Sequence, residues 1–324
     1  MRVGKLLNNE LIKEVLSKVT HFRPEVVVGA GLGEDCASLS TDKIILISTD
    51  PITAEVADIG SLAITVATND IYASGGVPMA LSLTILMPTS ATAEQVGEIM
   101  ECANAKAVEI GAEIIGGHTE FTDAVVRPVV TVTALGIAEN HLQTTNLVVG
   151  DSIIITKHIA LEGTAILATQ YENMLKDVLT EQELLFAKGL SKKTSIAKDA
   201  RIATSCKART MHDITEGGIY GALAEICQSS SLGAEISVDS IPKLDISQKI
   251  CNHLGINIYG LISSGSLLIT TPDPDAIIAK CKNEDINATV IGKIVATKGA
   301  YALQNEKREL LCVKADELFK LLEK

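Results

Sequence analysis

Five short acidic segments, distributed along most of the chain, are the feature that most constrains its fold. Each places an Asp or Glu beside Gly, Ser, Thr or Asn, and four of the five follow or interrupt an apolar run. Carboxylates at the ends of strands and helices, beside residues that let a ligand approach the backbone, are typical of sites in which hard cations hold a polyphosphate. The segments are GEDCA (33–37), STDP (48–51), TNDIYASGG (68–76), GGHTE (116–120) and HDITEGG (212–218).

Any one of these segments alone is also compatible with an ordinary turn or helix cap, because Asp, Asn, Ser and Gly dominate both. Short motifs of this kind have many chance matches. The interpretation therefore depends on the ordered set of five in one acidic chain.

The composition favours a two-domain α/β protein. The chain has 324 residues, and a length of about 150 residues per domain predicts about two domains. Its hydrophobic fraction is 47%, with no Trp and few other aromatic residues. The expected core is therefore built from Val, Ile, Leu and Ala, as in packed α/β layers.

The formal net charge of −12 argues against a nucleic-acid partner, because that affinity comes mainly from clustered Lys and Arg. An anionic substrate would need metal ions as intermediaries. Seven cysteines without a C-x-x-C pair indicate neither a disulfide framework nor a zinc site, which favours a reducing cytosol. With a polar segment at 1–10 and no apolar run of about 18 residues, we expect a cytoplasmic protein without a signal peptide or membrane span.

Apolar periodicity predicts alternating strands and helices in the first half and mainly helices, with later strands, in the second. We place the domain boundary near 149–151, which gives domains 1–149 and 150–324. The predicted helices are 7–19, 61–74 (capped by Ser61), 93–110, one that begins after 161–168, and a long one over 181–200; the predicted strands are 26–28, 44–49, 81–87, 125–137, 150–157, 267–270 and 290–294.

A glycine-rich loop in the first half is a candidate phosphate contact. Gly29, Gly31 and Gly33 precede Asp35 and would let the backbone approach phosphate oxygens. The spacing matches neither G-x-G-x-x-G before a helix nor a P-loop, so we reject a Rossmann or P-loop assignment. Cys36 has no His or other base near it in the sequence, so we expect a small buried residue there.

Three further acids of the first half are candidates. Asp50 follows an apolar strand, so we expect it at a strand tip, although a turn Asp before Pro51 is equally compatible. Asn69 and Asp70 interrupt an apolar helix, where polar side chains cost stability unless they find partners. We place Glu120, after the strand 113–115, at the mouth of the site.

His118, Asp213 and the pair of Lys157 and His158 have weaker signals. A lone His such as His118 is usually structural. Asp213 is compatible with an N-cap, but the glycines at 217–218 are poor helix formers and favour a site where a ligand approaches the backbone. Lys157 and His158 follow a strand and are compatible with either a phosphate contact or a surface loop.

With these segments in order, the chain is identified as a member of the aminoimidazole ribonucleotide (AIR) synthase-related superfamily. That superfamily carries G-[DE]-D-x-A, T-D, N-D-[IL]-x-A-x-G-x-x-P, G-G-x-T and D-x-[TS]-x-G-G in this order. The corresponding stretches here are GEDCA, STD, NDIYASGGVP, GGHTE and DITEGG. The resemblance spans nearly the whole chain.

The resemblance implies a two-domain α/β (α+β) fold: an N-terminal domain whose sheets pair across a homodimer into a barrel-like core, and a C-terminal α+β domain. It implies ATP in the cleft between the domains, bridged by Mg²⁺. By position it implies nucleotide contacts at Gly29, Gly31, Gly33, Asp35, Asp50, Asn69, Asp70, Gly117 and Asp213, and metal contacts at Asp35, Asp50, Asp70, Glu120 and Asp213.

Within the superfamily the chain resembles the hydrogenase maturation factor HypE most, over 58–88 and 212–237. HypE uses ATP to dehydrate a carboxamide carried on a cysteine at its extreme C-terminus. This chain departs from HypE there: it ends KADELFKLLEK and its last cysteine is Cys312. The cysteine that carries the substrate is missing, which argues against the carbamoyl-dehydratase role. His118 also stands where HypE and thiamine-monophosphate kinase usually have Asp. Because neutral imidazole is a poor Mg²⁺ ligand, we expect either that Glu120 replaces that acid or that one metal ion is lost.

Three functions follow as expectations. The first is a HypE-like enzyme that uses ATP to phosphorylate an oxygen of an amide, carbamoyl group or phosphate, with possible hydrogenase-maturation partners. The second is a small-molecule kinase of the thiamine-monophosphate type. The third is a non-catalytic nucleotide-binding scaffold, which is disfavoured because clustered acids cost stability without a ligand. Selenophosphate synthetase is disfavoured because no Cys lies in the glycine-rich loop.

Overall fold

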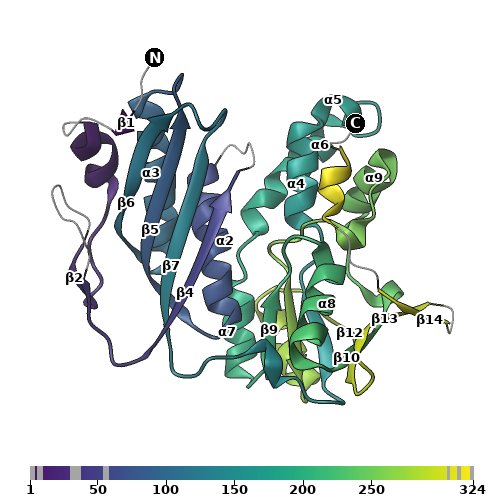
Figure 1. The fold of residues 1–324 in the computed structure, drawn as a ribbon. Helices are drawn as coiled ribbons and strands as arrows, with labels where there is room; N and C mark the ends of the chain where they lie inside the picture. The colour runs from purple at the N-terminus through teal and green to yellow at the C-terminus, as the bar shows by residue number, and fades with distance from the viewer. Residues whose placement is uncertain are drawn as a thin grey trace. The chain divides into compact units, whose positions relative to one another are not determined.

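The computed structural model divides the chain into two compact units (Figure 1). Unit 1 comprises Met1–Ile71 and Gly76–His141, and unit 2 comprises Tyr72–Gly75 and Leu142–Lys324. The structure describes residues 4–5, 10–29, 38–53, 58–304, 307–311 and 315–321. The domain boundary at 149/150 stays a prediction.

Unit 1 contains a five-stranded sheet in the order β1-β6-β5-β7-β4 and a separate β2–β3 hairpin. Only β5 and β6 pair in parallel; the other neighbours are antiparallel. The elements are β1 (Gly4–Lys5), η1 (Leu11–Val15), η2 (Leu16–Lys18), β2 (Val26–Val28), β3 (Ser38–Leu39), β4 (Ile44–Ile52), α2 (Ile59–Ala73), β5 (Val77–Pro88), α3 (Ala93–Ile110), β6 (Glu113–Thr122) and β7 (Val129–Ala138).

The helices α2 and α3 cover one face of this sheet (Figure 1). Alternate strand residues point to that face, among them Leu46 and Ile52 of β4, and pack into one aliphatic core with Ile71 of α2. The two helices approach so closely that a Cβ on Gly60 would lie 2.2 Å from the Ile99 carbonyl oxygen. Small residues thus permit a tight layer of helices on the sheet.

The other face of the sheet carries exposed apolar side chains. Ile45 and Ile47 of β4 point away from the helices, and Ile47 is 67% exposed. The Thr49 hydroxyl donates to Thr133 Oγ1 on the same face, at 3.0 Å. The strand alternation therefore leaves an apolar and hydroxyl-rich surface without a covering helix among the described residues.

Unit 2 contains a seven-stranded mixed sheet in the order β14-β13-β10-β12-β8-β11-β9. Its elements are η3 (Thr144–Asn146), β8 (Ser152–Thr156), α4 (Leu161–Gln170), α5 (Glu172–Leu175), α6 (Glu181–Gly189), η4 (Leu190–Lys193), α7 (Ala197–Ser205), β9 (Thr210–Asp213), α8 (Gly218–Ser230), β10 (Gly233–Ser237), η5 (Val238–Ser240), α9 (Asp245–Leu254), η6 (Ile258–Gly260), β11 (Leu267–Thr271), α10 (Pro274–Asn283), β12 (Ala288–Val295), β13 (Gly299–Gln304), β14 (Lys307–Leu310) and η7 (Glu317–Leu321).

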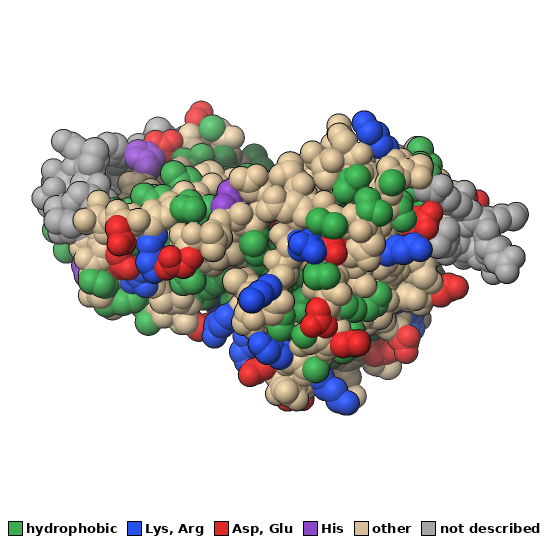
Figure 2. All heavy atoms as spheres, turned by 90° about the horizontal axis from the view of Figure 1, so that it is seen from below, with side chains coloured by type: hydrophobic (Ala, Val, Ile, Leu, Met, Phe, Trp, Pro, Cys, Tyr) green, Lys and Arg blue, Asp and Glu red, His purple; other side chains and the backbone are tan. Residues whose placement is uncertain are grey.

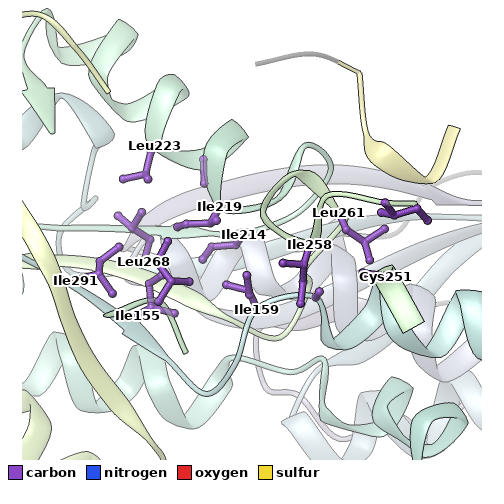
Figure 3. Packing of buried hydrophobic residues seen from close by; sticks show 14 of the residues in the cluster. Ile155, Ile159, Ile214, Ile219, Leu223, Cys251, Ile258, Leu261, Leu268 and Ile291 are labelled. Atoms are coloured by element: carbon purple, nitrogen blue, oxygen red, sulfur yellow. The ribbon is translucent and has the colours of Figure 1, made fainter. Parts of the chain in front are cut away.

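The core of unit 2 lies between this sheet and its helices. Figure 3 shows Ile219 and Leu223 of α8 beside Ile155, Leu268 and Ile291 of the sheet. These side chains are all buried and aliphatic. The expected core of Val, Ile, Leu and Ala is thereby confirmed for this unit, because the chain has few aromatic residues to fill it.

Several predicted helices differ from the observed ones. The helix over 7–19 is described only as the short turns η1 and η2. The helix over 61–74 begins two residues earlier, because Asp58 Oδ1 accepts the Ser61 N–H at 3.2 Å and so caps it in place of Ser61. LEGTAILA is itself the start of α4, and the 181–200 helix is broken after Gly189.

Several strands are longer than predicted or were missed. β4 continues to Ile52, so Asp50 lies inside the strand rather than at its tip. β6 runs to Thr122, which places His118 and Glu120 in mid-strand. The strands β9 and β10 fall where helices were predicted to dominate. Neighbouring strands stabilise all of these segments, and that pairing is invisible to a window of sequence.

Charged side chains of both signs are interspersed with apolar ones on the face shown in Figure 2. Among the described residues, none of the helices has the length and hydropathy needed to cross a bilayer. The described cysteines are free thiols, and burial raises the pKa of Cys251 to about 12. Cys36 and Cys312 lie outside the described residues.

Two neighbouring glycines of β6 offer a matched test of the sheet. A Cβ on Gly117 (φ +153°) would lie 2.0 Å from Leu83 O, whereas a Cβ on Gly116 would meet nothing within 4 Å. We expect Gly117→Ala to destabilise the fold by about 2–4 kcal/mol and Gly116→Ala by less than about 1 kcal/mol. Denaturant unfolding of both variants measures the difference, and equal losses would contradict this packing.

Candidate functional site

Asp50 and Asp70, two of the acids singled out by the sequence, share one hydroxyl partner. The Ser48 hydroxyl donates to Asp70 Oδ2 and lies 3.5 Å from Asp50 Oδ2. Ser48 and Asp50 are on the helix-covered face of β4, and Asp70 reaches them from α2. The fold thus brings together two acidic segments that are about twenty residues apart in sequence.

Asp70 perturbs the carboxyl group of Asp50. Burial raises the pKa of Asp50 to about 6, and the charge of Asp70 and a hydrogen bond to it act in the same direction. The Ser48 hydroxyl opposes the shift only in part. Two carboxylates held this close favour either a shared proton or a cation between them, because like charges cannot both ionise at low cost.

Asn69 adjoins this pair within α2. Its side chain is fully buried, with 0% exposure, in a helix whose neighbours are mostly aliphatic. Buried amides are retained where they find partners, and Asn69 has a partner within the fold. The expectation that 69–70 form the polar interruption of a buried helix is confirmed.

The glycine-rich loop can be followed only at its first residue. Gly29 lies against His21, so that an added Cβ would be 2.8 Å from the imidazole ring. That ring is anchored by Glu113, whose Oε1 lies 2.7 Å from His21 Nδ1. Gly31, Gly33 and Asp35 lie outside the described residues, so their predicted contacts with phosphate and metal stay predictions.

Glu120 is not brought together with Asp50 and Asp70. It lies beside His118, with Glu120 Oε2 3.1 Å from His118 Nε2. Phe121 packs into the helix-covered core, so the alternation along β6 directs His118 and Glu120 to the opposite, open face of the sheet. Gly117 faces Leu83 of β5 in the same strand pair.

Asp213 is the last residue of β9 in unit 2 and is almost completely buried. It is not the N-cap of α8: that position is Gly217, in a left-handed conformation with φ +82°. Gly218 also has positive φ (+60°), which explains the paired glycines. The strand end of Asp213 and the turn at 217–218 thus form a compact connection into α8.

Lys157 and His158 have structural contacts. The Lys157 ammonium donates to Ser195 O (2.6 Å) and to Asp199 Oδ2 (3.0 Å). The His158 carbonyl accepts the Ser266 hydroxyl at 2.6 Å. Lys157 therefore joins β8 to the start of α7 rather than forming a free surface loop.

Among the described residues, no group of three or more His, Cys, Asp or Glu side chains is placed to hold a metal ion. The pair of Asp50 and Asp70 supplies the carboxylate oxygens that Mg²⁺ prefers, with further positions left to substrate oxygens and water. Ser48 was missed as a site residue from sequence. Its position two residues before Asp50 in STDP, on the same face of the strand, was the available signal.

The raised pKa of Asp50 gives a pH-dependent stability. A carboxyl group whose pKa is higher in the folded state stabilises the fold below its ordinary pKa of 3.8, and that contribution is lost as the pH rises through about 6. Without divalent cations, the melting temperature of Asp50→Asn should therefore exceed that of wild type by an amount that grows as the pH rises from 4 to 7. Melting curves of both proteins check this, with exposed Asp42→Asn as the control; a constant difference would contradict it.

Curated relatives share much of the chain. A hydrogenase expression/formation protein of Methanocaldococcus jannaschii is 29% identical over 289 residues, which is 84% of this chain and 82% of the relative. The carbamoyl dehydratase HypE of Rhizobium leguminosarum bv. viciae is 27% identical, over 74% of this chain and 69% of the relative. Selenide, water dikinase 2 of Peptoclostridium acidaminophilum is 27% identical, over 96% of this chain and 94% of the relative.

Solved structures share the fold at lower identity. Escherichia coli HypE superposes with a TM-score of 0.81 at 18% identity, covering 95% of this chain and 97% of that one. HypE in complex with ATP gives 0.80 at 20% identity, covering 95% of both. AaThiL complexed with AMPPCP and TMP gives a TM-score of 0.67 at 20% identity, covering 86% of this chain and 89% of that one. A further structure, thiamine monophosphate kinase (thil) from Aquifex aeolicus, gives a TM-score of 0.66 at 20% identity, covering 83% of this chain and 91% of that one.

Both halves of the chain match models of one family. The AIR synthase related protein N-terminal domain matches residues 33–138, and the C-terminal domain matches 148–320. These matches and the superposed structures confirm the two-domain α/β fold that the motifs predicted. This chain therefore belongs to the AIR synthase related protein family.

Proposed function

We propose that this chain is an ATP- and Mg²⁺-dependent enzyme that activates an amide, carbamoyl or phosphate oxygen by phosphorylation. The observation that carries the proposal is the carboxyl pair of Asp50 and Asp70 around Ser48, held inside a folded layer. Such a pair raises the pKa of Asp50 and is costly without a cation. Both acids belong to the motif positions by which the family was identified.

The relatives support this class of activity. One related protein is a carbamoyl dehydratase, one solved structure of the same fold contains ATP, and another contains AMPPCP. A further solved structure is a HypE–HypF complex. By analogy we propose a role in hydrogenase maturation with a protein partner, in the cytoplasm.

In this proposal Asp50 and Asp70 hold Mg²⁺, with Asp35 and Asp213 as further acids and the glycines at 29, 31 and 33 facing phosphate oxygens. Bound Mg²⁺ would neutralise phosphate charge during phosphoryl transfer. Ser48 orients the Asp70 carboxylate, and buried Asn69 fixes that turn of α2. Gly117 and Glu120 stay predictions, and Glu120 on the open face of β6 would require a separate site.

We also propose a homodimer that forms through the open face of the unit 1 sheet. That face carries Ile45, Ile47 and Val77 in exposed positions. Exposed apolar patches of this kind on a sheet usually mark an interface. A second copy would bury them, as the family's barrel-like pairing of two sheets implies.

Nucleotide binding is the first test. We expect wild type to bind ATP and a non-hydrolysable analogue in calorimetry only when Mg²⁺ is present, and Asp70→Asn to lose at least about tenfold in affinity, since one charged ligand is removed. Asp123→Asn, at an exposed loop position, is the matched control. An assay for ADP release with amides, thiamine monophosphate and selenide would then identify the acceptor class.

If wild type does not bind ATP with Mg²⁺, both the proposed enzyme and a nucleotide-binding scaffold are excluded, and only a scaffold that does not bind nucleotide remains. If it binds but thiamine monophosphate alone stimulates ADP release, the kinase alternative replaces the amide-activating one.

Dimerisation is tested by a charge on the open face. Ile47→Asp should convert a dimer to a monomer in light scattering after gel filtration, because a carboxylate buried between two sheets lacks a partner. Leu185→Asp on α6, where the native side chain is 73% exposed, should leave the mass unchanged. A monomeric wild type, or an unchanged Ile47→Asp dimer, would exclude this face as the interface.

A further inference from the structure

Two helices of unit 2, α6 and α9, lie side by side, and both pack on α4 (Figure 1). The residues of α4 from Leu161 to Ala168 are all buried. The Thr164 hydroxyl of α4 lies 2.7 Å from Ser247 Oγ, which ties α9 to this helix. Leu184 of α6 packs against the core of the unit. The buried helix therefore fixes the positions of the two outer ones.

The facing sides of α6 and α9 leave an open groove with a volume of about 390 Å³. Ligand sites usually measure about 300–1,000 Å³, so this groove can receive a large side chain. Phe186 on one side of it is 50% exposed, and Ile246 on the other is partly buried. The groove is lined by Gln182, Glu183 and Phe186 of α6 and by Asp245, Ile246 and Lys249 of α9.

Lys249, the basic residue in this lining, is already paired. Its ammonium donates to Glu183 Oε1 at 2.9 Å, while Glu183 Oε2 accepts the Thr180 N–H at 2.8 Å. Hydrogen bonds from Thr180 and Lys249 lower the pKa of Glu183 to about 2. The pair therefore bridges the two helices, and its two charges compensate each other.

The charge that remains at the groove is negative. Asp245 lines it in the first turn of α9, and Glu181, the first residue of α6, directly precedes the lining residue Gln182. Within the described part of the chain, neither acid forms an ion pair. A basic occupant therefore complements the groove, and an acidic one is repelled.

Exposed apolar surface continues beyond the groove. Leu185, next to Phe186, is 73% exposed, and Met174 of α5 is 51% exposed. Met174 lies beside α9, because its carbonyl oxygen is 2.9 Å from His253 Nε2 of that helix. A small molecule confined to the groove would leave both apolar side chains in water, whereas a segment of a protein chain can cover them.

A second copy of this chain is a poor occupant of the groove. In a two-fold contact the same surface patch meets itself, so Asp245 and Glu181 would face the same acids of the other copy. Like charges brought together at an interface are unfavourable. The charge therefore favours a different protein that carries basic residues.

We propose that the groove between α6 and α9 docks a partner protein through a segment with one large apolar side chain flanked by Lys or Arg. The apolar side chain enters between Phe186 and Ile246, and the basic one pairs with Asp245. Every residue of the groove belongs to unit 2, and docking requires neither ATP nor Mg²⁺. The inference thus goes beyond the proposed enzyme activity and can be tested without it.

A peptide-display selection on the full chain, without nucleotide, tests this chemistry. From random peptides of about twelve residues, each round retains those that bind wild type and discards those that bind Phe186→Ala, which isolates the groove. Peptide charge is not part of the selection. We expect the enriched peptides to share a large apolar residue with Lys or Arg beside it.

The most enriched peptide is then titrated against two matched variants. Asp245→Lys should weaken its binding at least about tenfold, because an attractive charge pair becomes repulsive. Asp275→Lys, at an exposed position in the first turn of α10, should bind it as wild type does. Both substitutions place a cation in the first turn of a helix of unit 2, so their effects on folding are comparable and only docking separates them.

The proposal is overturned if no peptide separates wild type from Phe186→Ala, if the enriched peptides lack basic residues, or if Asp245→Lys and Asp275→Lys bind alike. Self-association of wild type that survives Ile47→Asp and is lost in Phe186→Ala would assign the groove to a second copy instead. ATP titrations of the same samples separate the two proposals: a chain that selects basic peptides but does not bind ATP with Mg²⁺ keeps the docking surface and loses the proposed enzyme.

Discussion

The packing of α2 onto the helix-covered face of the unit 1 sheet is the contact on which the candidate site depends. Ile71 packs among the sheet residues, and Gly60 allows α2 to lie close to α3. Once α2 is seated in this way, Asp70 lies beside Ser48 and Asp50 of β4. The aliphatic core thus provides the energy that holds two carboxyl groups together against their mutual repulsion.

The same sheet separates two kinds of chemistry by the alternation of its strands. Residues on one face join the core and the carboxyl pair, whereas Ile47, Thr49 and the His118–Glu120 pair point to the open face. A cation site and an interface between copies can therefore be built from neighbouring residues without competing for the same space. The acidic segments STDP and GGHTE consequently lie on one sheet with their acids on opposite faces.

Unit 2 uses buried acids in a different way. Asp316 satisfies backbone N–H groups at the turn before α8, and Ser264 favours the charged form of the buried Glu162 by lowering its pKa, against the larger effect of burial, which raises it. Both lie where glycines bring helix ends close to the loop 261–266.

The motifs in the sequence determined the family and the two-domain α/β fold, because their order and spacing can be read from the chain without knowing which residues are in contact. Local periodicity also determined α3 in full and the polar interruption at Asn69 and Asp70. Pairing decided the rest: β4 extends past Asp50 because β7 lies beside it, and β9 is a strand because β11 is its neighbour. Only the tertiary structure decided that Ser48 joins Asp50 to Asp70, that Glu120 lies on the opposite face, and that Glu162 is buried beside Ser264, since side-chain environment depends on residues far away in the sequence.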